Sequence, residues 1–210
     1  MDKTEITIKT YNISAKSFMD KFMDFKLYKN SQNEFVNYIK PGSKILDAGC
    51  GPGNIEKFLL EKDKTLRITG IDLSSEMIKL AKNNVSDAAF EVKDIRKLNY
   101  PKNEFDTIIC AFCLPYLYDE EALNFIKNIS KFLKPNGFLY ISTIEGHGNR
   151  FEKTSFSGEN EMFFNYYEEK FLLEAFKSNN LTIEKYFRQD YDETDGSKTV
   201  DMIFIVKKVK

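Results

Sequence analysis

Three glycines and an acid occupy the stretch KILDAGCGPGN, residues 44–54, and this spacing indicates a ligand-binding loop. The apolar residues before Asp47 are typical of a buried strand, and those that follow Gly53 have the spacing of a helix. Gly49 and Gly51 let the backbone turn sharply and let a ligand approach it closely. We therefore expect a strand, a tight loop and a helix around a bound small molecule.

The loop does not fit a phosphate ligand. The dinucleotide fingerprint has its third glycine five positions after the first, where this sequence has Asn54. The carboxylate of Asp47, two residues before Gly49, would repel a pyrophosphate. No Gly-Lys-Ser or Gly-Lys-Thr follows, so a phosphate-cradling NTPase loop is excluded as well.

Two further acids stand where later strands are expected to end. The stretch ITGIDLSSEMIKLA, residues 68–81, ends a strand at Asp72, where a carboxylate can accept both hydroxyls of an adenosine ribose. NAD enzymes share this feature, so it does not decide between cofactors by itself. FEVKDIRKL, residues 90–98, ends another strand at Asp94, which suits a donor such as an adenine amino group. A fourth strand end, in residues 105–117, should meet the same crevice.

The elements that must position these residues alternate along the chain. We predict strands at 44–48, 66–71, 89–92, 105–111 and 138–144, and helices at 54–62, 75–84, 119–137 and near 168–178. Such alternation predicts a parallel sheet covered on both faces. Residues 181–189 and 202–206 are predicted as antiparallel strands joined by the turn-rich 190–199, with the apolar 202–206 inside the sheet and the half-polar 181–189 at its edge.

Two segments outside this alternation are expected to cover the site. Residues 12–40 have helical spacings interrupted near Lys29, which predicts two short helices in an N-terminal cap over 1–40. Residues 145–167 are polar, glycine-bearing and aromatic, and they are too long for an ordinary connection, so they are predicted to form a lid. The whole chain, 1–210, is expected to be one domain.

The composition restricts the classes of partner and the metal content that we expect. The 31 basic and 32 acidic residues nearly cancel, so nucleic acid is not favoured as a partner. Cys50, Cys110 and Cys113 are an odd set that the single His147 does not complete into a zinc site, so no metal is expected and the cysteines are interpreted as reduced thiols of a cytoplasmic protein. No run has signal-peptide or membrane-spanning character, so no membrane association is expected. The pattern predicts no oligomeric state.

Together these motifs resemble those of class I S-adenosylmethionine-dependent methyltransferases, in particular the small single-domain kind that acts on small molecules. The resemblance runs from about Tyr11 to the C-terminus. ILDAGCGPG is similar to the family's first motif, GIDLSSEM to its ribose motif, VKDI to its adenine motif, FDTIICAF to its fourth and LKPNGFLYIS to its fifth. The resemblance implies an α/β fold, a Rossmann-like three-layer αβα sandwich whose seven-stranded, mostly parallel sheet has the order 3-2-1-4-5-7-6, with strand seven antiparallel.

The resemblance also implies S-adenosylmethionine as the cofactor. Residues 48–51 would hold its methionyl part and Asp72 its ribose hydroxyls. Leu73 and Met77 would lie against the adenine face, with Asp94 at its amino edge. The expected cofactor-binding residues are Tyr11, Asp47, Ala48, Gly49, Gly51, Asp72, Leu73, Met77, Asp94, Ile95, Ala111 and Phe112.

The methyl acceptor is expected to be a small molecule held by aromatic residues. The stretch CLPY, residues 113–116, invites comparison with the N-P-P-Y type motif of amino-group methyltransferases, but a cysteine is a poor acceptor and the spacing would start that motif at Ala111. Nucleobase or glutamine N-methylation is therefore not favoured. Aromatic faces exclude water and tolerate the sulfonium charge. The expected acceptor-binding residues are Phe18, Cys113, Tyr116 and Tyr166.

His147, the only histidine, is expected to face the acceptor pocket and to move the acceptor's proton. Glu145, two residues earlier, would orient the imidazole or take the proton itself. Methyl transfer is driven largely by positioning, so His147 as an exposed loop residue is the alternative. Two alternative functions stay open: a non-catalytic relative that binds the cofactor and, less favoured, an NAD-dependent oxidoreductase.

Overall fold

Seven strands form one sheet in the computed structural model, which describes residues 2–193 and 196–209. Five of them are parallel: β1 (Lys44–Ala48), β2 (Arg67–Asp72), β3 (Ala89–Val92), β4 (Phe105–Ala111) and β5 (Leu133–Ile144). β9 (Lys198–Lys208) runs antiparallel between β5 and the edge strand β8 (Leu181–Asp192). The order β3-β2-β1-β4-β5-β9-β8 confirms the predicted topology, because β8 and β9 are the predicted sixth and seventh strands. The predicted link between them includes Thr194 and Asp195, which lie outside the described residues.

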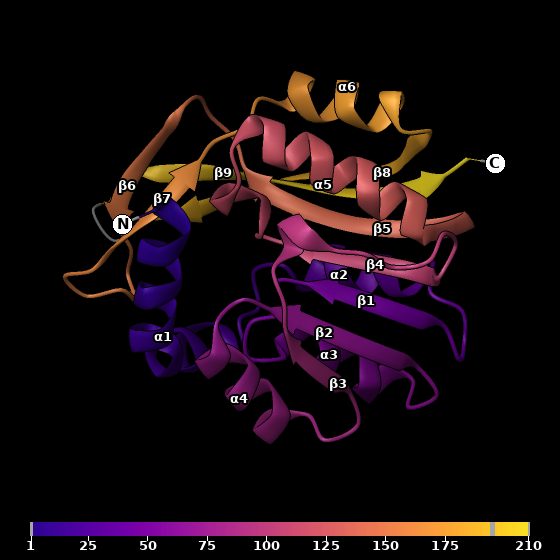
Figure 1. Ribbon diagram of the computed structural model, residues 1–210, viewed down its shortest axis with the longest axis horizontal. Helices are drawn as coiled ribbons and strands as arrows, with labels where there is room; N and C mark the ends of the chain where they lie inside the picture. Colours follow the sequence, from indigo (N-terminus) through magenta and orange to yellow (C-terminus); the bar gives the residue numbers. More distant parts are fainter. Residues whose placement is uncertain (1, 194–195, 210) are drawn as a thin grey trace.

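Helices cover both faces of the sheet, as Figure 1 shows. The helices are α2 (Lys29–Val36), α3 (Asn54–Lys62) and α4 (Ser75–Asn84) on one face, and α5 (Asp119–Phe132) and α6 (Glu169–Ser178) on the other. Alternate residues of a strand point to opposite faces. In β1, Leu46 therefore packs in the apolar cluster under α5 and α6, and Ile45 in the cluster under α3. The predicted three-layer α/β fold is confirmed.

The helix predicted over 119–137 ends earlier than expected. α5 stops at Phe132, and the Lys-Pro-Asn-Gly stretch that was expected to stop it lies within β5. Pro135 has no N–H to donate and disfavours a helical conformation of the residue before it. Asn136 then takes a positive φ of 61° and turns the chain into the regular part of β5.

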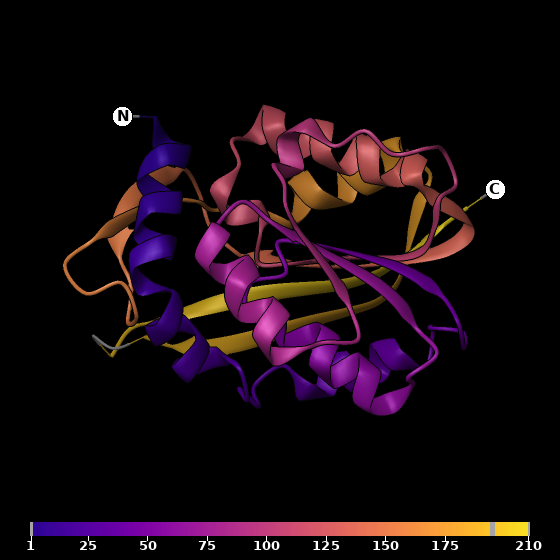
Figure 2. The same ribbon diagram turned by 60° about the horizontal axis from the view of Figure 1, so that its bottom comes forward.

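The N-terminal cap also differs from the prediction, because its first helix is long. α1 (Lys3–Phe22) has 20 residues and begins before the predicted helical range 12–40, in a part of the chain where its buried face carries threonines. The hydroxyl of Thr10 donates to the carbonyl of Glu161 at 2.8 Å, and the hydroxyl oxygen of Thr7 accepts from the N–H of Phe163 at 3.1 Å. α1 thus contacts the edge of a strand through polar residues, and it lies beside the hairpin of residues 149–165 (Figures 1 and 2).

The segment predicted as a lid forms an antiparallel hairpin. Its strands are β6 (Asn149–Lys153) and β7 (Glu161–Asn165), which make a second, two-stranded sheet. At its base the N–H of Gly146 donates to the carbonyl of Tyr167 at 3.1 Å, and the N–H of Tyr167 donates to the carbonyl of Ile144 at 3.2 Å. These bonds anchor the hairpin to the end of β5.

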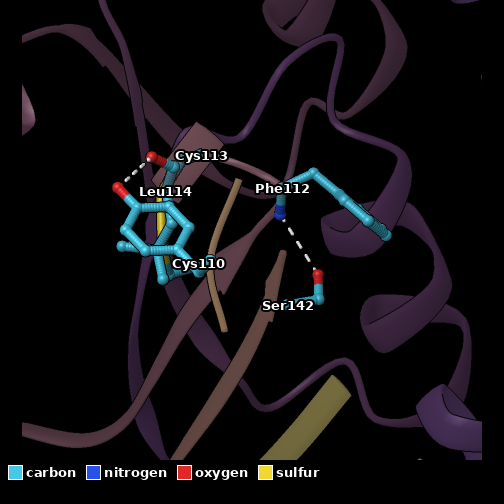
Figure 3. Close-up of a disulfide and its surroundings, with 6 residues drawn as sticks. Cys110, Phe112, Cys113, Leu114 and Ser142 are labelled. Atoms are coloured by element: carbon cyan, nitrogen blue, oxygen red, sulfur yellow. Dashed lines mark hydrogen bonds between the residues drawn. A yellow bond between two sulfur atoms is a disulfide. The ribbon is translucent and has the colours of Figure 1, made fainter. Parts of the chain in front are cut away.

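The prediction of three reduced cysteines is wrong. Cys110 and Cys113 form a disulfide, with their Cα atoms 5.9 Å apart (Figure 3), and Cys50 is a free, buried thiol. β4 ends at Ala111, and Phe112 takes a positive φ of 55° that folds Cys113 back beside Cys110. The overlooked signal was the C-x-x-C spacing of residues 110–113. The cytoplasmic interpretation loses the support that it drew from reduced thiols.

Candidate cofactor and acceptor cavity

A cavity of about 600 Å³ lies where β1 to β4 end, bounded by α1 and the β6–β7 hairpin. Ligands of open α/β sheets bind at this carboxyl edge. Fourteen of the eighteen predicted site residues line the cavity: Tyr11, Phe18, Gly49, Gly51, Asp72, Leu73, Met77, Asp94, Ile95, Ala111, Phe112, Cys113, Tyr116 and Tyr166. Asp47, Ala48, Glu145 and His147 do not line it.

The glycine loop is fixed to β2 by its backbone. The N–H groups of Gly49 and Cys50 both donate to the carbonyl of Ile71, at 2.8 and 3.0 Å. Gly49 must stay small, because a Cβ there would stand 2.7 Å from the Cβ of Cys113. Gly51, at φ 54°, would bring a Cβ only into ordinary contact with Phe18. The loop therefore packs against the disulfide turn at Gly49 and faces the cavity at Gly51.

Asp72 stands at the end of β2 with hydrogen-bonding capacity to spare. One carboxylate oxygen accepts from the N–H of Gly51 at 3.0 Å and the other from the N–H of Ser74 at 2.8 Å. Burial raises the pKa of Asp72, which these backbone hydrogen bonds partly oppose. Each oxygen keeps a further lone pair, as an acid that accepts two ribose hydroxyls requires.

Asp94 is already engaged by a residue that the sequence analysis did not single out. The guanidinium of Arg96 donates to both of its oxygens, with the shortest distance 2.7 Å, and the backbone N–H of Arg96 adds a 2.9 Å bond. Burial would raise the pKa of Asp94, but the hydrogen bonds and charge of Arg96 outweigh it and lower this pKa. Arg96 also donates to Thr4 at 2.8 Å. A ligand at Asp94 must therefore share the carboxylate with Arg96.

Beyond the glycine loop the cavity wall is aromatic. The ring centroids of Phe18 and Phe156 lie 5.0 Å apart, and those of Tyr11 and Phe156 lie 5.8 Å apart. The hydroxyls of Tyr11 and Tyr116 share a hydrogen bond that joins α1 to the turn after β4. Desolvation by burial raises the pKa of both phenols, so they stay neutral. Such a wall suits an apolar or aromatic ligand.

A polar pair, Tyr28 and Asp201, also lines this half of the cavity. The hydroxyl of Tyr28 donates to Oδ2 of Asp201 at 2.6 Å, and the Tyr28 ring lies 5.0 Å from that of Phe112. Asp201 is 2% exposed, and burial raises its pKa to about 6. Sequence reasoning missed the pair, because Asp201 directly precedes an apolar strand segment and Tyr28 lies at a helix start.

The structure does not bring His147 and Glu145 to the cavity. The His147 side chain is 80% exposed, and its Nδ1 lies 2.6 Å from Oε1 of Glu168. Glu145 forms an ion pair with Arg188 on β8. A hydrogen bond from the N–H of Gly146 to the carbonyl of Tyr167 fixes the backbone beside His147 at the base of the hairpin, with the imidazole exposed. The prediction that His147 faces the acceptor pocket is thus contradicted, and the alternative of an exposed loop residue describes its position.

The described residues were also compared with the requirements of a metal site and of a membrane-spanning helix. Among residues 2–193 and 196–209, no group of three or more His, Cys, Asp or Glu side chains is placed to hold a metal ion. In the same part of the chain, no helix has the length and apolar character that crossing a membrane requires.

Comparison with known proteins shows which sequences this chain resembles. Residues 45–137 match the family described as methyltransferase domain. A putative methyltransferase 235L of Invertebrate iridescent virus 6 is 34% identical over 137 residues, which is 64% of this chain and 49% of the viral protein. Phosphoethanolamine N-methyltransferase 1 of Arabidopsis thaliana is 37% identical over 115 residues, 52% of this chain and 23% of the plant protein. The chain thus spans half or less of these two relatives.

Solved structures share the fold. That of the 1,6-didemethyltoxoflavin-N1-methyltransferase of Burkholderia thailandensis superposes with a TM-score of 0.74 at 18% identity, covering 99% of this chain and 89% of that one. The chain belongs to the class I S-adenosylmethionine-dependent methyltransferases. S-adenosylmethionine is the cofactor of this family, and the residues present fit it. Asp72 has lone pairs free for two hydroxyls, Gly51 opens the loop to the cavity, and Leu73 and Met77 add apolar surface.

Proposed function

We propose that this protein transfers a methyl group from S-adenosylmethionine to a small-molecule acceptor bound in the aromatic half of the cavity. The observation that supports this proposal is the continuity of the cavity, which joins Asp72 and Gly51 to the aromatic wall around Phe18 and Phe156. A volume of about 600 Å³ is in the range of small-ligand sites. The plant relative, named for phosphoethanolamine, also takes a small acceptor.

The bound cofactor supplies an electrophilic methyl group. The residues of this chain orient both reactants, which is the main requirement of an in-line displacement. Rings such as Phe18 and Phe156 present faces that favour a cationic sulfonium and exclude water. In this proposal α1 and the β6–β7 hairpin act as the lid of a single domain, and the hydrogen bond between Tyr11 and Tyr116 closes the lid over the cavity.

Asp201 takes the part that the sequence analysis gave to His147. Its pKa of about 6 leaves it largely ionised at pH 7, so it can accept a proton from an acceptor hydroxyl or amine. The hydroxyl of Tyr28 donates to Oδ2 of Asp201, which holds this oxygen in place, and it does not bind Oδ1. This arrangement favours an acceptor that loses a proton as it is methylated.

The experiment is a methyl-transfer assay with labelled S-adenosylmethionine and a panel of phenols, amines, thiols and heteroaromatic compounds. We expect labelled product with at least one small apolar or aromatic acceptor, and loss of that product in Asp72→Ala. Asp87→Ala, an exposed acid of the same type, is the matched control and should turn over normally. Tight cofactor binding with no transfer to any acceptor would favour a non-catalytic relative instead.

A further inference from the structure

Two carboxyl groups, those of Asp47 and Glu56, are buried together behind the glycine loop. Asp47 is 1% exposed and Glu56 is 0% exposed. Within residues 2–193 and 196–209, no group completes a hydrogen bond to any of their four oxygens, although the backbone N–H of Glu56 acts to lower the pKa of its own carboxyl. Neither side chain lines the cavity, so neither is positioned to contact a ligand directly. The cofactor assignment given to Asp47 from sequence therefore needs a different explanation.

The pair joins the two ends of the loop. Asp47 lies in β1 just before it, and Glu56 lies in the first turn of α3 just after it. Asp47 is opposite Gly70 in the sheet, and a Cβ on Gly70 would stand 2.6 Å from Oε1 of Glu56. Glu56 thus reaches back over β2 into the space that the missing side chain of Gly70 leaves. The loop between the two acids carries Gly51, which faces the cavity.

Two such carboxylates cannot both be ionised without a large free-energy cost. In addition to burial, the nearby charge of Asp72, at the end of β2, raises the pKa of both carboxyls, and within the described residues no cationic group opposes it. Burial and, in turn, the two carboxyls raise the pKa of the Cys50 thiol in the loop. Burial raises the pKa of Asp47 to about 7, and burial followed by the charge of Asp47 raises the pKa of Glu56 well above its usual range. One shared proton gives the pair both a donor and an acceptor.

We propose that Asp47 and Glu56 share a proton in a carboxyl–carboxylate hydrogen bond that positions the glycine loop and links cofactor binding to proton release. This inference rests on the proposed function, because that function assigns the loop to the cofactor. At slightly acidic pH the pair holds two protons and is neutral. A ligand that brings a protonated amino group to the loop favours the form of the pair with one proton and one negative charge, so binding releases part of a proton.

The test is calorimetric titration of the full chain with S-adenosylhomocysteine, whose amino group is protonated at these pH values. Titrations at pH 6, 7 and 8 are run in two buffers of different ionisation enthalpy. We expect affinity to rise about three- to tenfold from pH 6 to pH 8, because a pKa shift of up to about one unit gives at most a tenfold change. At pH 6 and 7 the measured enthalpy should depend on the buffer, which reports the released proton.

Glu56→Gln isolates the pair from other titrating acids such as Asp201 and Asp72. The amide of glutamine donates to Asp47 at every pH, so the loop stays positioned and the shared proton is gone. We expect affinity at pH 8 within about threefold of the parent, with both the pH dependence and the buffer dependence lost. Glu61→Gln makes the same change on the exposed face of α3 and should behave as the parent. Thermal unfolding of both variants checks that the fold is intact.

Three outcomes distinguish the inference from the function on which it rests. Binding of S-adenosylhomocysteine that depends neither on pH nor on buffer overturns the proton-sharing pair and leaves the proposed function in place. The same pH dependence in Glu56→Gln and in the parent also overturns it, because another group must then be the source. No binding at any pH contradicts the proposed function itself.

Discussion

The hydroxyl of Tyr28 donates a 2.6 Å hydrogen bond to Asp201, and this bond joins the start of α2 to β9 at the wall of the cavity. β9 runs against its neighbour β5, so its first residues, and not its last, lie at the carboxyl edge of the sheet. Asp201 is paired with Ile144, the last residue of β5. The reversed strand therefore supplies the aromatic half of the cavity with a buried carboxylate.

Asp201→Asn should slow methyl transfer to a working acceptor by about a hundredfold, because general-base catalysis contributes on the order of 10² or more. S-adenosylhomocysteine affinity should stay within about twofold, since the amide can still bind Tyr28. In the parent the rate should rise as pH passes the Asp201 pKa of about 6 and then level off. Initial rates of the parent and the variant between pH 5 and 8 measure the loss of turnover and the pH profile. Undiminished turnover in the variant would rule out this base.

Asp47→Asn should stabilise the ligand-free protein more at pH 8 than at pH 5. The folded pKa of Asp47 is raised to about 7 from an ordinary value of 3.8, so the folded state holds a proton that the unfolded state releases. Stability from this group is therefore lost as pH rises from about 4 to 7. We expect the gain in Tm over the parent to be at least about 4 °C larger at pH 8. Thermal unfolding measures it, with exposed Asp87→Asn as control, and an equal gain at both pH values would contradict the raised pKa.

A thiol assay tests the disulfide. Protein purified without reductant and unfolded in denaturant should show one reactive thiol, that of Cys50, and three after reduction. In the folded protein Cys50 should react slowly, because it is buried and because burial raises its pKa. Three thiols without reduction would mean that Cys110 and Cys113 are reduced.

The strand–loop–helix pattern and the family motifs were sufficient to predict the sheet and most of the cavity. Asp72 and Gly51 are predictable because a strand end and a glycine loop are local features, and both line the cavity. Asp201 is not, because it reaches the cavity only through the reversal of β9. The length of α1 was missed because Thr7 and Thr10 bind β7 through hydroxyls, which leaves no apolar periodicity. Arg96 was missed because its role depends on contacts with Asp94 and Thr4.

The two strand-end acids should differ in their effect on cofactor affinity. Asp72→Ala should weaken S-adenosylhomocysteine binding about ten- to a hundredfold, since hydrogen bonds to a charged group contribute on the order of 1.5 to 3 kcal/mol. Asp94→Ala should weaken it less, because Arg96 already occupies that carboxylate. Calorimetry ranks the two variants, and the reverse order would show that Asp94 is the principal acid for the cofactor.

Direct titration of the protein with S-adenosylhomocysteine and, separately, with NAD is the measurement closest to the central claim. The glycine loop lacks the third glycine of a dinucleotide site, so we predict saturable, one-to-one binding of S-adenosylhomocysteine and no measurable binding of NAD. Tight binding of NAD with no response to S-adenosylhomocysteine would contradict the account.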